Sequence, residues 1–279
     1  MGENVSRAVA GLVGAGVAAG VYAVLSRRAD ASWRRTDHAG RTVTLYAGPA
    51  AALGAAAGIA AAPGPARDRA AGVLAVPAAA GCGAYDNLVG ADDPRRGFRA
   101  HLGALRGGEV TGGAVKLFGI GAAGVLTGLL IEERVVDGVL TGVVIAGTAH
   151  LVNLVDVGPG VAVGSVLLLG ASGLPGAVGP IAAAAVLAPA DLGERAMLGD
   201  AGAHGLGAAL GVALARRRGR PGGRFVGSFV GSFVGRTGRV ALAAGLVASA
   251  SNGERISSVA RRASGVLRRA AGVAGVPGR

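Results

Sequence analysis

Long apolar runs recur along this chain, and they constrain its fold more than any other feature. Each run approaches the roughly 20 residues that an α-helix needs to cross a bilayer. The runs occupy residues 8–25, 43–62, 70–85, 112–130, 135–153, 161–190 with a break after 171, 199–215 and 238–250. Only 16% of the residues are charged, whereas soluble domains carry about 25%. We therefore expect an all-α, polytopic membrane bundle without a sheet.

The break in the 161–190 run decides the expected number of spans. It coincides with the sequence "SGLPG", residues 172–176, and Gly and Pro are strong helix breakers. If two hinged helices flank this break, the bundle has about nine transmembrane helices, within a range of about eight to ten.

The apolar runs consist mainly of Ala, Gly and Val, and the chain contains 53 glycines. Small residues allow membrane helices to approach one another closely, which predicts tight packing. A GC-rich genome is an alternative cause, because Lys116 is the only lysine among the 28 basic residues. The sequence leaves both explanations open.

The net charge of +12 arises from arginines that lie between the apolar runs. Five of them lie in residues 26–42, four in residues 86–111 and six after Asn252. Cytoplasmic loops carry such an excess of basic residues, so we attribute the charge to membrane topology rather than to nucleic-acid binding. The N-terminus and the acidic loop after residue 131 are then expected outside. The basic segment 216–224 breaks this pattern, and the path of residues 216–236 is left open.

The chain is expected to be a multi-pass protein of the bacterial plasma membrane. Residues 1–253 are expected to form the membrane domain, and residues 254–279 a basic cytoplasmic tail. Basic residues follow the first apolar run rather than precede it, which indicates a retained helix and not a signal peptide. Cys82 is the only cysteine, so no internal disulfide can form.

Three aspartates lie at the edges of apolar runs on the expected cytoplasmic face: Asp86, Asp156 and Asp200. An unpaired Asp at the bilayer centre costs ~3 kcal/mol, and a place at the interface avoids most of that cost. Helices packed side by side would bring the three carboxylates together, where they repel one another unless a cation joins them. Oxygen ligands of this kind suit Mg²⁺, which also binds substrate phosphates. The pattern predicts Mg²⁺-dependent phosphate chemistry at the membrane surface.

The sequence "HLVNLVD" places His150, Asn153 and Asp156 on one face of a helix. A binding site and a solvated helix end both explain such a stripe. A carboxylate at a helix C-terminus is disfavoured by the helix dipole, which favours a site at Asp156. For Asp200 the alternative is an N-cap, and a site and a cap can coexist. His204 lies on the same helical face as Asp200, and its alternative is an ordinary surface position.

Residues 92–116, which follow Asp86 and Asn87, have simpler interpretations. Residues 95–107 are typical of an amphipathic helix lying on the membrane surface, with His101 within it. Lys116 is expected to extend its ammonium group toward water. Asp92 and Asp93, followed by Pro and Arg, are expected in a solvated turn.

Three ordered motifs resemble those of the polyprenyl-phosphate N-acetylhexosamine-1-phosphate transferases, the family of the phospho-N-acetylmuramoyl-pentapeptide transferase. The family's first motif is an Asp-Asp pair, and "AYDNLVG" resembles it at Asp86 and Asn87. Its second is Asn-x-x-Asn-x-x-Asp, which "HLVNLVD" resembles with a His in the first position. Its third is Gly-Asp-x-Gly, matched by "GDAG" from Gly199 to Gly202. The resemblance covers roughly residues 33–211.

The resemblance implies the transfer of a sugar-1-phosphate from a UDP-amino sugar to a membrane polyprenyl phosphate. The lipid phosphate attacks the β-phosphate of the donor, and UMP leaves, as a step in bacterial envelope polysaccharide synthesis. Asp156 and Asp200 would hold Mg²⁺, and Asp86 and Asp156 would be the catalytic carboxylates, with Asp86 near the lipid phosphate. The expected substrate-binding residues are Asn87, Asn153, His150 and His204.

Two departures from the family pattern motivate an alternative function. Asn87 replaces the second Asp of the first motif, and an amide cannot carry a negative charge. The family's late histidine-rich loop has no counterpart, and the tandem repeat "RFVGSFVGSFVGR", residues 224–236, stands in its place. The alternative is a catalytically degenerate relative that acts as a membrane binding or scaffold protein. Self-association into a homodimer is left open.

Overall fold

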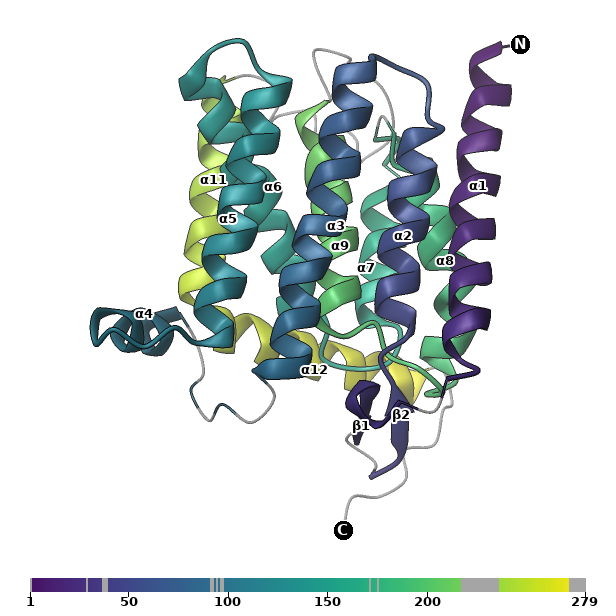
Figure 1. Ribbon diagram of the computed structural model, residues 1–279, viewed down its shortest axis with the longest axis vertical. Helices are drawn as coiled ribbons and strands as arrows, with labels where there is room; N and C mark the ends of the chain where they lie inside the picture. Colours follow the sequence, from purple (N-terminus) through teal and green to yellow (C-terminus); the bar gives the residue numbers. More distant parts are fainter. Residues whose placement is uncertain are drawn as a thin grey trace.

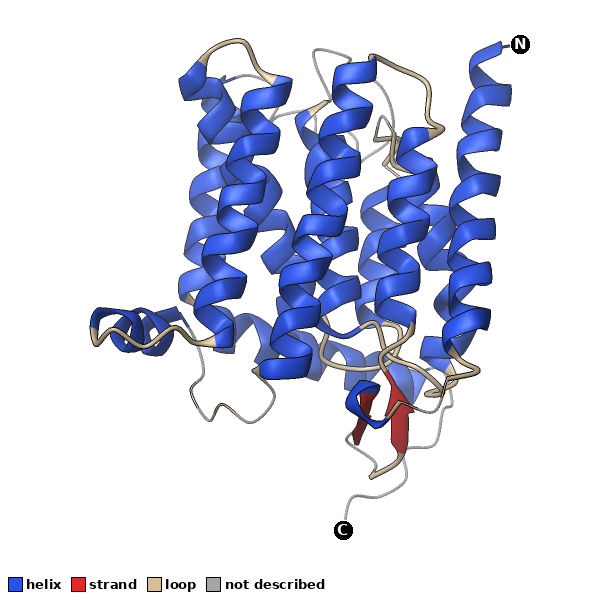
Figure 2. Cartoon of the chain, viewed as in Figure 1, coloured by secondary structure: helices blue, strands red, loops and turns tan. Residues whose placement is uncertain are grey.

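The chain forms a helical bundle in a computed structural model (Figures 1 and 2). The structure describes residues 2–28, 30–36, 40–90, 93, 95, 98–170, 172–174, 176–216 and 236–270. The α-helices are α1 Gly2–Leu25, α2 Ala47–Ala60, α3 Ala66–Val89, α4 Phe98–Arg106, α5 Gly112–Ile131, α6 Val135–Val155, α7 Val161–Gly170, α8 Val178–Leu192, α9 Gly199–Ala215, α11 Arg236–Ser251 and α12 Gly253–Ala270. Most of them run along the bundle axis, whereas α4 and α12 lie across the end opposite the N-terminus (Figure 1).

The predicted helical class is confirmed, and the membrane assignment is supported by three helices that are long and apolar enough to span a bilayer. These are α1, α5 and α6, and the apolar helices α2, α7 and α8 are shorter. Among the described residues, helix length and composition thus identify three candidate spans rather than about nine. The expected break after residue 171 is present, because α7 ends at Gly170 and α8 begins at Val178.

The expectation of a bundle without any sheet is wrong in the segment between α1 and α2. A short 3-10 helix, η1 Ala31–Trp33, leads into strand β1 Arg34–Thr36, which pairs antiparallel with β2 Thr42–Thr44. The hairpin is anchored to the bundle by a stack of Trp33 on Tyr46, with ring centroids 6.0 Å apart. Its three-residue strands are too short to give an alternating pattern that a sequence reader would notice.

Glycines bring the backbones of neighbouring helices into direct contact. A Cβ atom on Gly58 of α2 would lie 2.5 Å from Cα of Gly179 on α8. A Cβ on Gly142 of α6 would lie 2.5 Å from Cα of Val125 on α5, and one on Gly211 of α9 would lie 2.7 Å from Cα of Ile145 on α6. Real side chains do not tolerate such distances, so close packing requires glycine at these positions, whatever the base composition of the genome.

Helix α9 is the centre of the bundle, and almost every residue from Ala201 to Ala215 is buried. It packs against α2, α3 and α6 and makes fewer contacts with α7 and α8. Large apolar side chains such as Leu12, Leu126 and Leu168 are instead exposed on the outer helices. Exposed large apolar side chains on the outer helices suit a bundle surrounded by lipid.

An ionic cluster closes the bundle at the end that carries the loop between α5 and α6. The guanidinium of Arg239 on α11 lies 2.7 Å from Oε1 of Glu132 and 3.9 Å from Oδ1 of Asp137. Thr141 donates its hydroxyl to the same Glu132 oxygen at 3.2 Å. Two of the three acids in and beside the α5–α6 loop therefore join α11 to the α5–α6 hairpin. The segment 217–235 lies outside the described residues.

The two amphipathic segments lie at the other end. The helix predicted within residues 95–107 is confirmed as α4, which lies across the bundle end (Figure 1). The segment expected as a basic tail is helical as far as Ala270 and forms α12. Ser257 on α12 donates a hydrogen bond of 2.8 Å to the carbonyl of Leu154, which fixes α12 to the last turn of α6.

We expect Gly58→Ala to lower the stability of the bundle by about 1–3 kcal/mol, because the added methyl group must displace the backbone of α8. Gly121→Ala on α5 is the matched control, since nothing lies within 4 Å of its added Cβ. Thermal unfolding of the detergent-solubilised chain measures both effects. Equal melting temperatures for the two variants would contradict the packing argument.

Candidate functional site

The three motifs meet at the end of the bundle where α4 and α12 lie. Asp86 and Asn87 occupy the last turn of α3, Asp156 follows the last residue of α6, and Asp200 is in the first turn of α9. Helices α3 and α6 both pack against α9. Motifs separated by more than 40 residues in the sequence therefore lie at one level of the bundle.

Lys116 of α5 lies between two of the motif carboxylates. Its Nζ is 2.6 Å from Oδ2 of Asp86 and 2.6 Å from Oδ2 of Asp200. The three side chains are 18%, 20% and 26% exposed, respectively. The expectation that Lys116 extends toward water is therefore wrong, because two acids from neighbouring helices offer its ammonium group closer partners.

The close approach of α3 to α9 positions these acids. A Cβ on Gly83 would lie 2.5 Å from the carbonyl carbon of Asp200, so only glycine fits at this crossing. Asp86 follows three residues later on α3 and is thereby brought beside Asp200. Asp200 lies at the positive end of the α9 dipole, which stabilises its carboxylate.

His204 is fully buried, at 0% exposure, and the alternative of a helix-surface position is wrong. It lies on α9, which other helices surround. Its Nδ1 is 2.7 Å from the carbonyl oxygen of Asp200, so Nδ1 carries the proton and donates. Nε2 is then an acceptor, and it is buried without a hydrogen-bond partner among the described residues. The half-buried ring of His150 lies 6.4 Å from the His204 ring, measured between centroids.

Asn87 lies between the first and third motifs. Its Nδ2 atom is buried and has no hydrogen-bond partner in the described part of the chain. A Cβ on Gly199 would lie 3.1 Å from that nitrogen. The backbone carbonyl of Asn87 accepts a hydrogen bond from the guanidinium of Arg35 on β1. Asn87 therefore offers a buried N–H donor at the position that the motif resemblance aligns with a second carboxylate.

Asp156 is destabilised by its surroundings. Burial, followed by repulsion from Asp191 and Asp200, raises the pKa of its carboxyl group well above the usual range. Asp191 is itself buried and accepts a hydrogen bond of 2.7 Å from the backbone N–H of Gly160. Asn153, one turn earlier on α6, is half-buried. The polar stripe thus ends among carboxylates at the bundle end.

The residues present do not fit the predicted magnesium site. Among the described residues, no group of three or more His, Cys, Asp or Glu is arranged to hold a metal ion. Asp200, one of the two expected ligands, is already paired with Lys116. The other expected ligand, Asp156, lies close enough to Asp200 for their carboxylates to repel each other. These two acids alone do not make a group of three metal-binding side chains.

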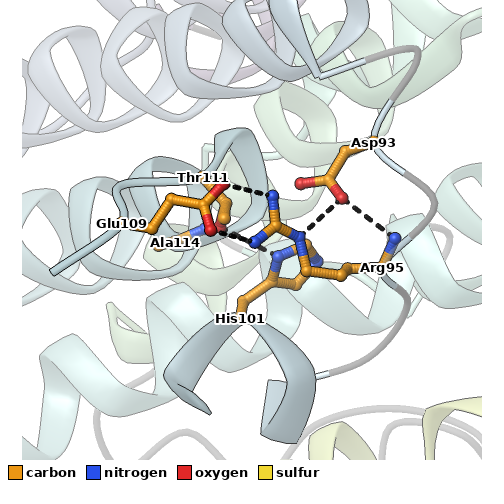
Figure 3. Close-up of polar contacts among 6 residues, drawn as sticks. All are labelled: Asp93, Arg95, His101, Glu109, Thr111 and Ala114. Carbon is orange, nitrogen blue, oxygen red and sulfur yellow. Dashed lines mark hydrogen bonds and ion pairs between the residues drawn. The ribbon is translucent and has the colours of Figure 1, made fainter. Parts of the chain in front are cut away.

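A second polar cluster braces the N-terminus of α5 (Figure 3). The guanidinium of Arg95 binds both carboxylate oxygens of Glu109, at 2.7 and 2.8 Å, and lies 2.8 Å from Asp93. These contacts lower the pKa of both acids and raise that of Arg95. Asp93 also accepts from the backbone N–H of Arg95, as expected for a turn, whereas Asp92 lies outside the described residues.

The N-cap of α5 is part of the same cluster. Thr111 accepts a hydrogen bond of 3.1 Å from the backbone N–H of Ala114, and His101 Nδ1 lies 2.9 Å from the Thr111 hydroxyl oxygen. This capping fixes the first turn of α5. Lys116 lies within the next turn, so the cluster around α4 fixes the base from which Lys116 reaches the acids.

Sequence reasoning missed three residues of this region: Lys116 as an ion-pair partner, Asp191 and Arg35. Only Lys116 left a clear signal, because it is a charge inside an apolar run, and such a charge requires a partner. Comparison with known proteins adds no further residues, because no protein-family model, curated protein or solved structure matches this chain.

We expect Lys116→Met to destabilise the chain by about 2–4 kcal/mol, because it leaves two partly buried carboxylates without their counter-charge. Combining it with Asp86→Asn and Asp200→Asn should restore most of that loss. Urea or thermal unfolding in detergent at neutral pH measures the difference. A triple variant as unstable as the single one would show that the charges are not coupled.

We expect Asp156→Asn to stabilise the folded chain at neutral pH. A raised pKa means that the folded state favours the neutral acid, so wild-type stability is lost as the pH rises from its ordinary value of 3.8 through the folded pKa. The amide variant lacks this loss. The melting temperatures of the two proteins should therefore be similar at acidic pH and differ increasingly as the pH rises. A constant difference across pH 4–8 would contradict a raised pKa for Asp156.

Proposed function

We propose that this chain transfers a sugar-1-phosphate from a UDP-amino sugar to a membrane polyprenyl phosphate, with release of UMP. The observation that supports this most is the convergence of three motif segments, from α3, α6 and α9, at one end of an apolar bundle. Each segment resembles a motif of the polyprenyl-phosphate N-acetylhexosamine-1-phosphate transferases. The order of the motifs along the chain and their proximity in the folded bundle are two independent observations, and both support the resemblance.

The same proposal includes a topology. About nine helices cross the plasma membrane of a bacterium, the motif end faces the cytoplasm, and the N-terminus lies outside. The amphipathic helices α4 and α12 lie across the motif end (Figure 1), where a membrane–water interface would accommodate them. Helices too short to span alone, such as α7 and α8, are held in place by their neighbours.

The chemistry proposed is a direct exchange at phosphorus. An oxygen of the lipid phosphate forms a bond to the β-phosphorus of the donor, and the bond between that phosphorus and the oxygen bridging to the α-phosphate breaks. UMP leaves with the electron pair of that bond. In such a transfer a protein contributes mainly position and charge. Lys116 and Arg35 would supply positive charge beside the first motif, with Asp86 next to the lipid phosphate.

Two unpartnered atoms suit recognition of the donor. Nδ2 of Asn87 can donate to a phosphate or sugar oxygen, and Nε2 of His204 can accept from a hydroxyl or amide N–H. A buried polar atom without a partner costs about 1–3 kcal/mol, so a ligand that satisfied both would recover part of its binding energy from them. His150 and Asn153 line the α6 side of the same region.

One observation favours a second function. Lys116 already neutralises part of the Asp86 and Asp200 charge, and Asn87 replaces a carboxylate. A relative that kept the fold but lost turnover would bind polyprenyl phosphate, or a partner protein carrying it, without releasing UMP. This candidate differs from the first in chemistry and not in location.

We expect the purified chain, reconstituted with polyprenyl phosphate and UDP-N-acetylglucosamine, to release UMP, as measured by chromatography. Asp156→Asn and Asp200→Asn should each reduce the rate by at least about 100-fold, because electrostatic contributions of single groups reach that size. Glu133→Gln, an exposed acid at the opposite end of the bundle, is the matched control and should retain full activity. Lipid binding without UMP release from several UDP-amino sugars would select the second function.

A further inference from the structure

We infer that Lys116 is the resident cation of this site and does, between Asp86 and Asp200, the work that the convergence of three carboxylates led us to expect of Mg²⁺. This inference concerns the cation of the carboxylate cluster, and it stands whether or not the chain transfers a sugar phosphate. It predicts that the wild-type chain has no divalent-ion site at the motifs and that loss of one side chain creates such a site.

The geometry of Lys116 excludes a metal ion that bridges the same two oxygens. Its Nζ lies 2.6 Å from Oδ2 of Asp86 and 2.6 Å from Oδ2 of Asp200. A Mg²⁺ ion bound to both oxygens at ~2.1 Å would occupy nearly the same point as this nitrogen. One of the two cations must therefore be absent, and the ammonium is covalently attached to α5.

Four features hold the ammonium at this point. Its helix packs against α3 and α6, and the hydroxyl of Thr111 caps the first turn of that helix. Gly83 allows the α3–α9 contact that brings both acids within reach. The lysine side chain is mostly buried, so water competes weakly for its protons. Displacement of the ammonium by a metal ion would leave a cation in a partly apolar place without its partners.

Asn87 removes the ligand that a metal ion would need in addition. At the second position of the first motif the chain has an amide, whose buried Nδ2 is a hydrogen-bond donor without a partner among the described residues. An amide carries no negative charge, so it attracts a cation less than a second carboxylate at this position would. The amide at position 87 and the ion pairs of Lys116 both lower the net negative charge at the motifs, so a bound metal ion would stabilise them less.

The test measures Mn²⁺ binding by electron paramagnetic resonance on the purified full-length chain in detergent, with Mn²⁺ as the probe for Mg²⁺. The proteins compared are wild type, Lys116→Met, Lys116→Arg, Asp200→Asn, and Lys116→Met combined with Asp200→Asn. Wild type and Lys116→Arg should show no saturable binding. Lys116→Met should bind about one ion per chain, at least about tenfold tighter than wild type, because a unit charge a few ångströms away has been removed.

The double variant keeps only one of the two carboxylates and should lose this binding. Mg²⁺ should also raise the melting temperature of Lys116→Met and of no other variant, since an ion that binds only the folded state stabilises it. Saturable Mn²⁺ binding by the wild type that Asp200→Asn abolishes would overturn the inference, and so would a folded Lys116→Met chain that binds none. If Lys116→Met does not fold, the comparison of wild type with Asp200→Asn decides the matter.

Discussion

The contact between Gly83 and the backbone of Asp200 is the constraint on which the site depends. Any side chain at Gly83 would push α3 away from α9, and Asp86 would move with it. The contact creates a problem as well as a site, because it places two carboxylates side by side in a region of low dielectric constant. Lys116 solves that problem from a third helix. Backbone packing and charge pairing are therefore parts of one arrangement.

At each end of the bundle, a basic side chain lies between two acids from neighbouring segments, but the surroundings of the two clusters differ. At the end that carries the α5–α6 loop, Arg239 of α11 joins Glu132 and Asp137, and at the motif end Lys116 joins Asp86 and Asp200. Both ion pairs link three segments of the chain and hold a cation between two acids. The motif end also has two further acids and the unpartnered side-chain atoms of Asn87 and His204, whereas Nε of Arg239 is the unpartnered buried atom at the other end in the described part of the chain. The larger number of polar groups without internal partners at the motif end is typical of a binding site.

The sequence predicted helices well where an apolar run had clear ends. The run at 112–130 became α5 Gly112–Ile131, and the run at 135–153 became α6 Val135–Val155. The sequence also placed the motif residues at helix ends. It did not predict that His204 is buried, because the small residues on every side of α9 give no periodic face. Nor could it pair Lys116 with acids 30 and 84 residues away, because such a contact arises only from tertiary packing.

The two proposed functions make different demands on the protonation state of Asp156. Asp156 is half-buried near Asp191 and Asp200, and desolvation followed by repulsion from both acids favours the protonated form of its carboxyl group. A transferase would require Asp156 to be ionised at some stage, and binding of a cationic or hydrogen-bond-donating group would have to overcome that preference. A binding or scaffold protein would tolerate the proton. A carboxyl group held in surroundings that disfavour its charge is typical of a functional site. The free energy needed to ionise Asp156 is therefore the part of the ligand-binding energy that a catalytic role would have to supply.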